Sequence, residues 1–257
     1  MLKIRHKLRR LIVVLVALGG VGVWLIVNPE SYQNIFTEFE DTGTNQSTDA
    51  SANQFSAIAT TEADPNAPLA TEILDRLVVK GRAPKTNYSR EEFYNNWPTV
   101  DGCNLRQKII KREFGDTAKL DGCTVLSGEY DEPYTGEHKT YNEKSEISSG
   151  IQIDHVVALS DAWQKGADFN HMSSEKRYAL ATDPLNLVAV DSKANQSKSD
   201  GDAATWLPAN KKFRCQYVAR QVSVKYKYEL WVTDAEKTAI LKVLENCPNE
   251  PAIGVSL

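Results

Sequence analysis

Asp154 and His155 stand side by side in the segment IDHVV, where they offer a carboxylate and an imidazole for chemistry. An imidazole titrates near neutral pH, so His155 has the right range to take a proton from water as a general base. A carboxylate is a hard ligand suited to a divalent cation such as Mg²⁺. Taken alone, the pair is weak evidence, because adjacent strand residues point to opposite faces. Only a strand end or a bulge brings both side chains to one site.

A second polar group follows in DPLNLVAVDSKANQSKSDGDAATWLP, residues 183–208. Asn186 opens an apolar run, and Asn195 follows nine residues later in a polar segment that also carries Lys198. The pattern around these residues predicts the elements that must position them. They are two strands and then a helix, at residues 151–157, 185–190 and 192–198.

This order, a strand with Asp-His, a strand with Asn and a helix with Asn, resembles the HNH, or ββα-metal (His-Me finger), nucleases. More narrowly, the sequence resembles an exported bacterial HNH endonuclease family whose domain is shared with the C-terminal part of GmrSD-type restriction enzymes. The resemblance covers residues 71–247 and rests on separated blocks in the right order. These blocks are DGCNLRQ (101–107), SGEYDEPYTG (127–136), IDHVVALSDAWQKGA (153–167), the 183–208 segment and Cys215-Gln216-Tyr217.

The resemblance implies a role for each of these residues. His155 matches the general base, and Asp154 and Asn195 match the ligands of a divalent metal ion, with Mg²⁺ the expected cofactor. Asn186 matches the middle Asn of the family, whose task is to fix the loop that holds the base. Two positions depart from the pattern: many HNH enzymes have His where Asn195 stands, and many relatives have Pro near Ala158. The first departure bears on metal affinity and the second only on backbone geometry.

Residues 186–228 form a locally basic stretch, with eight Lys or Arg against three acids. Such a stretch can neutralise phosphates, which dominate the salt-dependent part of nucleic-acid affinity, or it can be an ordinary solvated face. No base-reading element is visible, so we expect little sequence specificity. The candidate nucleic-acid contacts are Lys193, Lys198, Lys211, Lys212 and Arg214, with Arg112 as a weaker candidate.

The chain has 257 residues, a formal net charge of −4 and 41% apolar residues. The charge excludes a globally basic nucleic-acid coat protein, and the apolar content can build a core. Short strands and helices without βαβ regularity predict an α+β fold, and the resemblance implies a ββα-metal core with added helices. The remaining predicted elements are helices at 103–114, 161–165, 174–181, 203–206 and 234–244, a strand at 123–126, and a turn-rich stretch at 127–150.

Three regions are predicted along the chain. Residues 1–27 join five cations to a seventeen-residue apolar run, which predicts an uncleaved signal anchor or, as the alternative, a cleaved signal peptide. Because the cations precede the apolar run, everything after it is expected to be exported. Residues 28–70 are acidic and poor in apolar periodicity, which predicts a flexible linker, and 71–257 are expected to be the nuclease domain.

The four cysteines, an even number on the exported side, predict two disulfides. Sequence proximity favours pairing Cys103 with Cys123 and Cys215 with Cys247, although three pairings are possible. A zinc site is the weaker reading, because no C-x-x-C spacing is present.

The sequence thus predicts a secreted or membrane-anchored, metal-dependent HNH endonuclease that hydrolyses DNA, with RNA as a second candidate substrate. The alternative is a non-catalytic extracellular nucleic-acid-binding module with the same fold, and a third reading is an exported domain with an unrelated role. The set of Asp154, His155 and Asn195 favours the enzyme, since a binding module needs no general base. No nucleotide cofactor is expected, because no Gly-rich phosphate loop is present.

Overall fold

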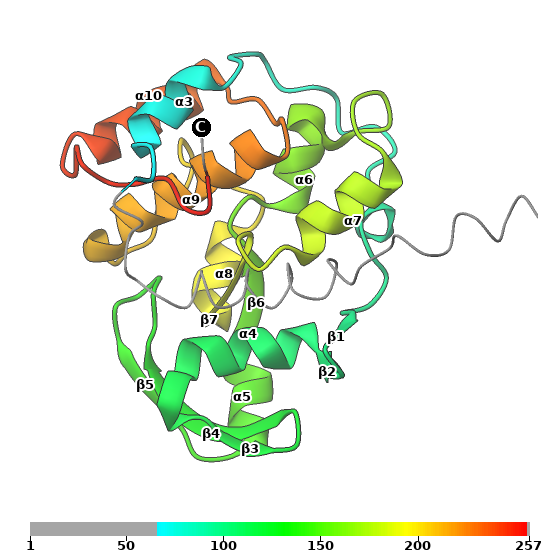
Figure 1. Cartoon of the computed structure of the whole chain (residues 1–257), viewed down its shortest axis with the longest axis vertical. Helices are drawn as coiled ribbons and strands as arrows, with labels where there is room; N and C mark the ends of the chain where they lie inside the picture. The colour runs from blue at the N-terminus through cyan, green and yellow to red at the C-terminus, as the bar shows by residue number, and fades with distance from the viewer. Residues whose placement is uncertain (1–65, 256–257) are drawn as a thin grey trace, which may run out of the picture. The chain divides into compact units, whose positions relative to one another are not determined.

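The computed structural model describes residues 66–255 (Figure 1). The predictions for the leader at 1–27, and for the linker up to residue 65, lie outside the described residues. Within 66–255, no helix is both long enough and apolar enough to cross a membrane.

The described residues combine helices with small antiparallel sheets, which confirms the predicted α+β class (Figure 1). The helical segments are α3 (Ala70–Arg76), η2 (Arg90–Glu92), α4 (Leu105–Phe114), η3 (Gly115–Thr117), α5 (Lys144–Gly150), α6 (Leu159–Ala162), η4 (Trp163–Ala167), α7 (Ser174–Thr182), α8 (Ser192–Lys198), η5 (Lys211–Phe213), α9 (Arg214–Lys227) and α10 (Asp234–Leu244). The strands are β1 (Thr99–Val100), β2 (Cys103–Asn104), β3 (Lys119–Asp121), β4 (Thr124–Asp131), β5 (His138–Tyr141), β6 (Ile151–His155) and β7 (Leu187–Asp191).

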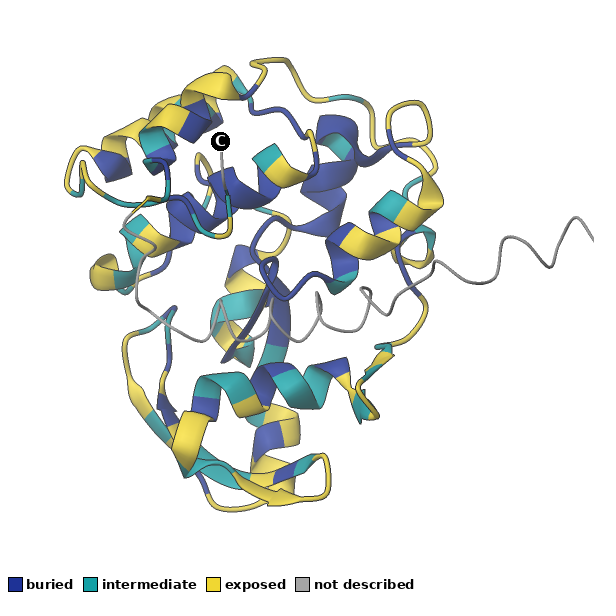
Figure 2. Cartoon of the chain, in the orientation of Figure 1, coloured by how far each residue is buried: buried dark blue, intermediate teal, exposed yellow. Residues whose placement is uncertain are grey.

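The pair β6–β7 lies in the interior and carries the predicted Asp-His pair. The two strands are antiparallel, with Asp154 opposite Val188 and His155 opposite Leu187. Figure 2 shows both strands almost wholly buried, in contrast to the largely exposed hairpin of β3 and β4. A strand buried on both faces needs no polar alternation, which explains the continuous apolar run of β7.

Helix α8 follows β7 directly and packs on both strands. Asp191 ends the strand and caps the helix, because its side chain accepts hydrogen bonds from the backbone N–H groups of Lys193 and Ala194. The order strand, strand, helix expected around Asp154 and Asn195 is therefore present at β6, β7 and α8.

The longest described helix, α9, lies between two of the three apolar clusters of the core. Val222 belongs to the cluster shared with α3 and α10, whereas Val224 belongs to the cluster around Trp163. The third cluster joins α4 to β4, β6 and β7. The β6–β7 pair is thus held by packing from both sides.

Both predicted disulfide pairs are confirmed. Cys103 lies beside Cys123 with a Cα–Cα distance of 5.5 Å, and Cys215 lies beside Cys247 at 6.3 Å. The second pair joins the first turn of α9 to the residues after α10.

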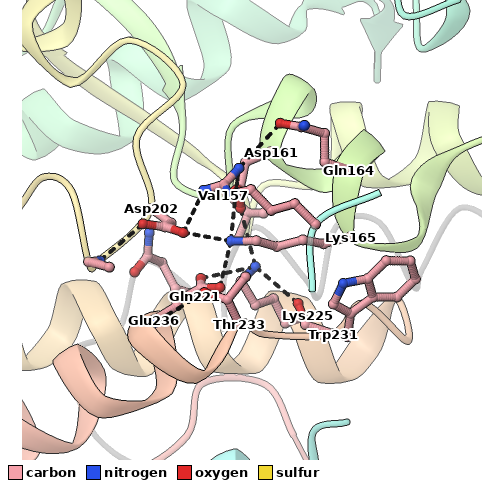
Figure 3. Close-up of polar contacts among 12 residues, drawn as sticks. Val157, Asp161, Gln164, Lys165, Asp202, Gln221, Lys225, Trp231, Thr233 and Glu236 are labelled. Carbon is pink, nitrogen blue, oxygen red and sulfur yellow. Dashed lines mark hydrogen bonds and ion pairs between the residues drawn. The ribbon is translucent and has the colours of Figure 1, made fainter. Parts of the chain in front are cut away.

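A buried ion network fastens the C-terminal helices to the segment after β6 (Figure 3). The ammonium of Lys165 lies 2.6 to 2.8 Å from three carboxylates, and Lys225 approaches two of the same carboxylates at 3.1 and 3.3 Å. Three cations face three carboxylates, so the network is balanced in charge. Its members are Arg82, Asp161, Lys165, Asp202, Lys225 and Glu236.

Several sequence predictions of secondary structure were wrong or missing. Residues 127–150, predicted as turns, contain the rest of β4, the strand β5 and helix α5, because residues 128–131 pair with 138–141. Residues 203–206 form turns rather than a helix, since Asp202 accepts the backbone N–H groups that follow it. Helix α9 was not predicted at all.

Candidate functional site

Strand alternation places the two central residues on opposite faces of β6. The side chain of Asp154 faces α8, where Lys198 contacts it. The side chain of His155 faces α7 and the segment that contains Tyr94 and Trp97. We expected the end of the strand to bring Asp154 and His155 into one site. In the structure, their side chains lie on opposite faces of β6.

His155 is held at the end of β6 in a defined orientation. Its Nε2 lies 2.9 Å from the carbonyl oxygen of Ala181. Because a carbonyl only accepts, Nε2 carries the proton and Nδ1 keeps a free lone pair. The ring stacks on Trp97, with centroids 6.0 Å apart and planes 9° apart, and Tyr94 packs beside it.

The environment keeps the imidazole of His155 neutral. Its side chain is only 5% exposed. Burial, together with the nearby charge of Arg90, lowers the pKa of His155 to about 3. This pKa lies below the range expected from the sequence, so the imidazole is a weak base while the aromatic rings of Tyr94 and Trp97 cover it.

Asn186 connects the segment after β6 to the last turn of α7, which holds the imidazole of His155. Its Oδ1 accepts the backbone N–H of Val157 at 2.8 Å, and its Nδ2 donates to the carbonyls of Val157 and Leu180. Leu180 precedes Ala181, whose carbonyl holds the imidazole of His155. The side chain is fully buried, so its contacts are with the protein and not with a ligand.

Asp154 is already paired with protein groups. Each of its carboxylate oxygens lies 3.0 Å from Nζ of Lys198, and the hydroxyl of Tyr134 donates to Oδ2. Lys198 also donates to the carbonyl of His155 at 2.8 Å. Burial raises the pKa of Asp154, and the charge of Lys198 opposes that rise. Nζ of Lys198 thus supplies the positive charge that a metal ion would bring.

Asn195 does not meet Asp154 in this structure. Its Nδ2 donates at 2.8 Å to Oε1 of Gln152, which lies two residues before Asp154 on β6. The predicted ligand pair is therefore not assembled, and the residues as arranged do not fit a metal ion. Within the described part of the chain, the group of acidic, His and Cys side chains close enough to bind a metal is Cys215, Cys247 and Glu250, and its two sulfurs form a disulfide.

The predicted nucleic-acid contacts fall into three environments. Lys193, Lys211 and Lys212 are exposed, and Arg214 is partly buried and donates to the carbonyl of Pro208. Lys198 differs from the prediction, because it is 2% exposed and committed to Asp154. It is not available to a phosphate in this arrangement.

An open groove of about 870 Å³ lies beside β7. Val188, which is opposite Asp154 in the strand pair, contributes to its floor. Of the predicted contacts, Lys211 and Lys212 lie on its rim, and Arg112 and Arg220 also line it.

Sequence reasoning missed several residues that shape the site. Tyr134 lies in the SGEYDEPYTG block, so its position in that block was a signal, although its contact with Asp154 was not foreseen. Arg90, Tyr94 and Trp97 lie some sixty residues before His155, and nothing in the local pattern linked them to it.

Comparison with known proteins gives two matches. Residues 104–243 match the family model for the C-terminal domain of GmrSD restriction endonucleases. The chain is also 36% identical over 187 residues to an "Uncharacterized secreted protein" of Arthroderma benhamiae, an alignment covering 71% of this chain and 87% of that protein. This relative is fungal, so it lends no support to the bacterial origin suggested by the resemblance. No solved structure matches.

The family match spans β6, β7 and α8, together with all of the residues that line the groove. On these grounds the chain belongs to the family of the C-terminal domain of GmrSD restriction endonucleases.

Proposed function

We propose that this protein is a nuclease that hydrolyses phosphodiester bonds, with His155 as the general base. The observation that carries the proposal is the way His155 is held: it is a neutral imidazole at a strand end, oriented by the carbonyl of Ala181 in the last turn of α7, next to Leu180, which Asn186 contacts. The family match, to a domain of restriction endonucleases, supports the same reaction class.

The chemistry assigned to His155 is proton transfer from the attacking water. Nδ1 is the basic atom, because Nε2 already donates to Ala181. Arg90 is an exposed cation whose charge acts on the imidazole, so it is the nearest candidate to neutralise a bound phosphodiester. The proposal requires the segment containing Tyr94 and Trp97 to move aside when substrate binds.

We assign no step to a metal ion. The predicted ligands Asp154 and Asn195 are bound to Lys198 and Gln152 instead of facing each other. Dependence on Mg²⁺ stays a prediction, as do the preference for DNA over RNA and the low sequence specificity.

The test uses the full-length protein, its His155→Gln variant and a matched His138→Gln control, whose side chain is 58% exposed. Each is incubated with plasmid DNA and with RNA, in Mg²⁺ or in EDTA. Loss of a general base should lower the rate about 100-fold or more, whereas the control should match the wild type. Equal rates for wild type and His155→Gln would remove His155 from the reaction.

A second candidate is a non-catalytic nucleic-acid-binding module. The closed site favours it, because His155 is covered by Trp97 and Asp154 is neutralised by Lys198. If the folded wild-type protein binds nucleic acid but cleaves neither polymer under either condition, this candidate replaces the nuclease.

We also propose that the protein acts outside the cell. Two disulfides are typical of an oxidising compartment, and the related fungal protein is named as secreted. Anchoring through residues 11–27 stays a prediction, which immunoblotting of the membrane and culture fractions with an antibody to the domain would test.

A further inference from the structure

The groove beside β7 has two arginines at its inner wall. Arg220 projects from α9 and Arg112 from α4, and both donate to the carbonyl oxygens of Pro184 and Leu187. Nε of Arg220 also donates to the carbonyl of Leu185 at 2.7 Å. Two cations are therefore held together by the short segment that precedes and opens β7.

The two arginines differ in how their charges are compensated. Arg112 forms an ion pair with Glu113. Arg220 is 5% exposed, and its guanidinium donates to backbone carbonyls, whereas Glu113 and Asp183 act on it through their charges. Burial of a cation is costly, and carbonyls offset only part of that cost. An anion in the groove would bring a negative charge into direct contact with the guanidinium.

The acids that line the groove are already engaged. Glu132 accepts hydrogen bonds from the backbone N–H groups of Tyr134 and Thr135, and Asp131 contacts His138. Glu113 is bound to Arg112. None of these three carboxylates pairs with Arg220.

Arg220 remains a cation at neutral pH. Burial and the charge of Arg112 lower its pKa to about 10, which is still well above neutrality. The exposed Lys211 and Lys212 on the rim add further positive charge where a ligand would enter.

We propose that this groove is a phosphate-binding subsite, with Arg220 as its buried contact and Lys211 and Lys212 at its rim, for a backbone phosphate of a nucleic-acid strand. The inference rests on the proposed function, since the substrate of a nuclease carries the phosphates that this subsite would bind. The groove lies on the Asp154 face of the strand pair, because Val188, which lines it, is opposite Asp154.

The decisive variant is Gln216→Glu. Gln216 is exposed, lines the groove and lies one helical turn before Arg220 on the same face of α9. A carboxylate there would offer Arg220 an internal counter-ion and repel an incoming phosphate, without removing any contact that holds the fold. Asn249→Asp is the matched control, because it makes the same charge change at an exposed position outside the groove.

Binding of a fluorescent single-stranded DNA oligonucleotide to the full-length protein is measured by anisotropy in EDTA, at two salt concentrations. We expect Gln216→Glu to weaken binding about tenfold and Asn249→Asp less than about twofold, with the gap narrowing at high salt. Equal affinities for the two variants would overturn the proposal.

Two further measurements distinguish a phosphate of a nucleic-acid strand from free inorganic phosphate as the ligand of the groove. An oligonucleotide of the same sequence with uncharged methylphosphonate linkages should lose the effect of Gln216→Glu, because no charged phosphate enters the groove. If inorganic phosphate binds and the charged oligonucleotide does not, the groove serves free phosphate and the proposal for a strand is overturned.

Hydrolysis is assayed separately on the same three proteins. If the wild type cleaves nucleic acid and Gln216→Glu binds as well as the control, the proposed subsite is overturned and the proposed nuclease activity is supported. If the wild type binds through the groove but cleaves nothing, the proposed subsite is supported and the proposed nuclease activity is overturned.

Discussion

Lys198 is the last residue of α8, and its side chain contacts Asp154 on β6. Its Nζ lies 3.0 Å from both carboxylate oxygens of Asp154. The two residues are almost fully buried, at 2% and 6% exposure. This ion pair fastens α8 to the strand that carries His155. It also occupies the carboxylate that the sequence assigned to a metal ion.

Replacing Lys198 by Met should therefore destabilise the protein strongly. The change leaves Asp154 as a buried charge with one remaining donor, Tyr134, and breaking such a pair costs about 3 to 5 kcal/mol. Urea unfolding of the variant measures the loss. Lys193→Met, at an exposed position of the same helix, is the control and should stay within about 0.5 kcal/mol of the wild type.

Asn186→Ala should weaken the contacts that hold His155 in position. The variant leaves the N–H of Val157 and the carbonyls of Val157 and Leu180 without their side-chain partner in a buried place, at a cost of about 1 to 3 kcal/mol. We expect lower stability in urea unfolding and a lower rate of cleavage. Full activity in this variant would contradict a positioning role, and Asn249→Ala serves as the exposed control.

The stability of the protein should fall as the solution is acidified below the ordinary titration range of His. The pKa of His155 is lowered from an ordinary 6.5 to about 3, so between these values the unfolded chain binds a proton that the folded chain does not. This contribution is fully present above pH 6.5 and is lost towards pH 3, by about 1.4 kcal/mol per pH unit.

The measurement is the free energy of unfolding from pH 7 to pH 4 for the wild type and for His155→Gln. Other groups titrate over the same range, so the informative quantity is the difference between the two slopes. A variant with the same slope as the wild type would show that His155 is not held neutral.

Trp97→Ala should raise the pKa of His155. The change removes the ring that stacks on the imidazole and lets water reach it, which reduces the desolvation that lowers the pKa. Titration of the His ring protons by NMR, with His155 assigned through His155→Gln, should show a rise of about one unit or more. Trp97→Phe keeps an aromatic cover and should show a smaller rise.

The local elements around the site were predictable because their signals are local. Helix α8 spans Ser192–Lys198 as predicted, since Asp191 provides a cap and the preceding run is apolar. Helix α10 likewise begins after Thr233, whose side chain accepts the backbone N–H of Glu236.

Helix α9 was missed because it is buried over most of its surface. Residues 217–225 are all buried, including polar ones such as Gln221 and Arg220, so no polar face marks the helical period. The hairpin of β4 and β5 was missed for a different reason. Its pairing joins residues on either side of the breakers Pro133 and Gly136, and local composition reports only the turn.

The candidate site was predicted as a set of residues but not as an arrangement. The sequence identified Asp154, His155 and Asn186, and strand alternation already indicated that the first two would diverge. It could not reveal that Lys198 would turn inward to Asp154, because a Lys near the end of a polar helix ordinarily lies in solvent. Nor could it reveal that Trp97 would cover His155.

The ion network of Arg82, Asp161, Lys165, Asp202, Lys225 and Glu236 restricts how this sequence can change over time. Replacing any buried member of the network by an uncharged residue leaves an uncompensated charge in the interior. A second substitution must then remove or neutralise that charge. The compensating partner lies up to 120 residues away along the chain, between Arg82 and Asp202. Substitutions in distant segments of this protein are therefore energetically coupled, although none of these six residues lines the groove.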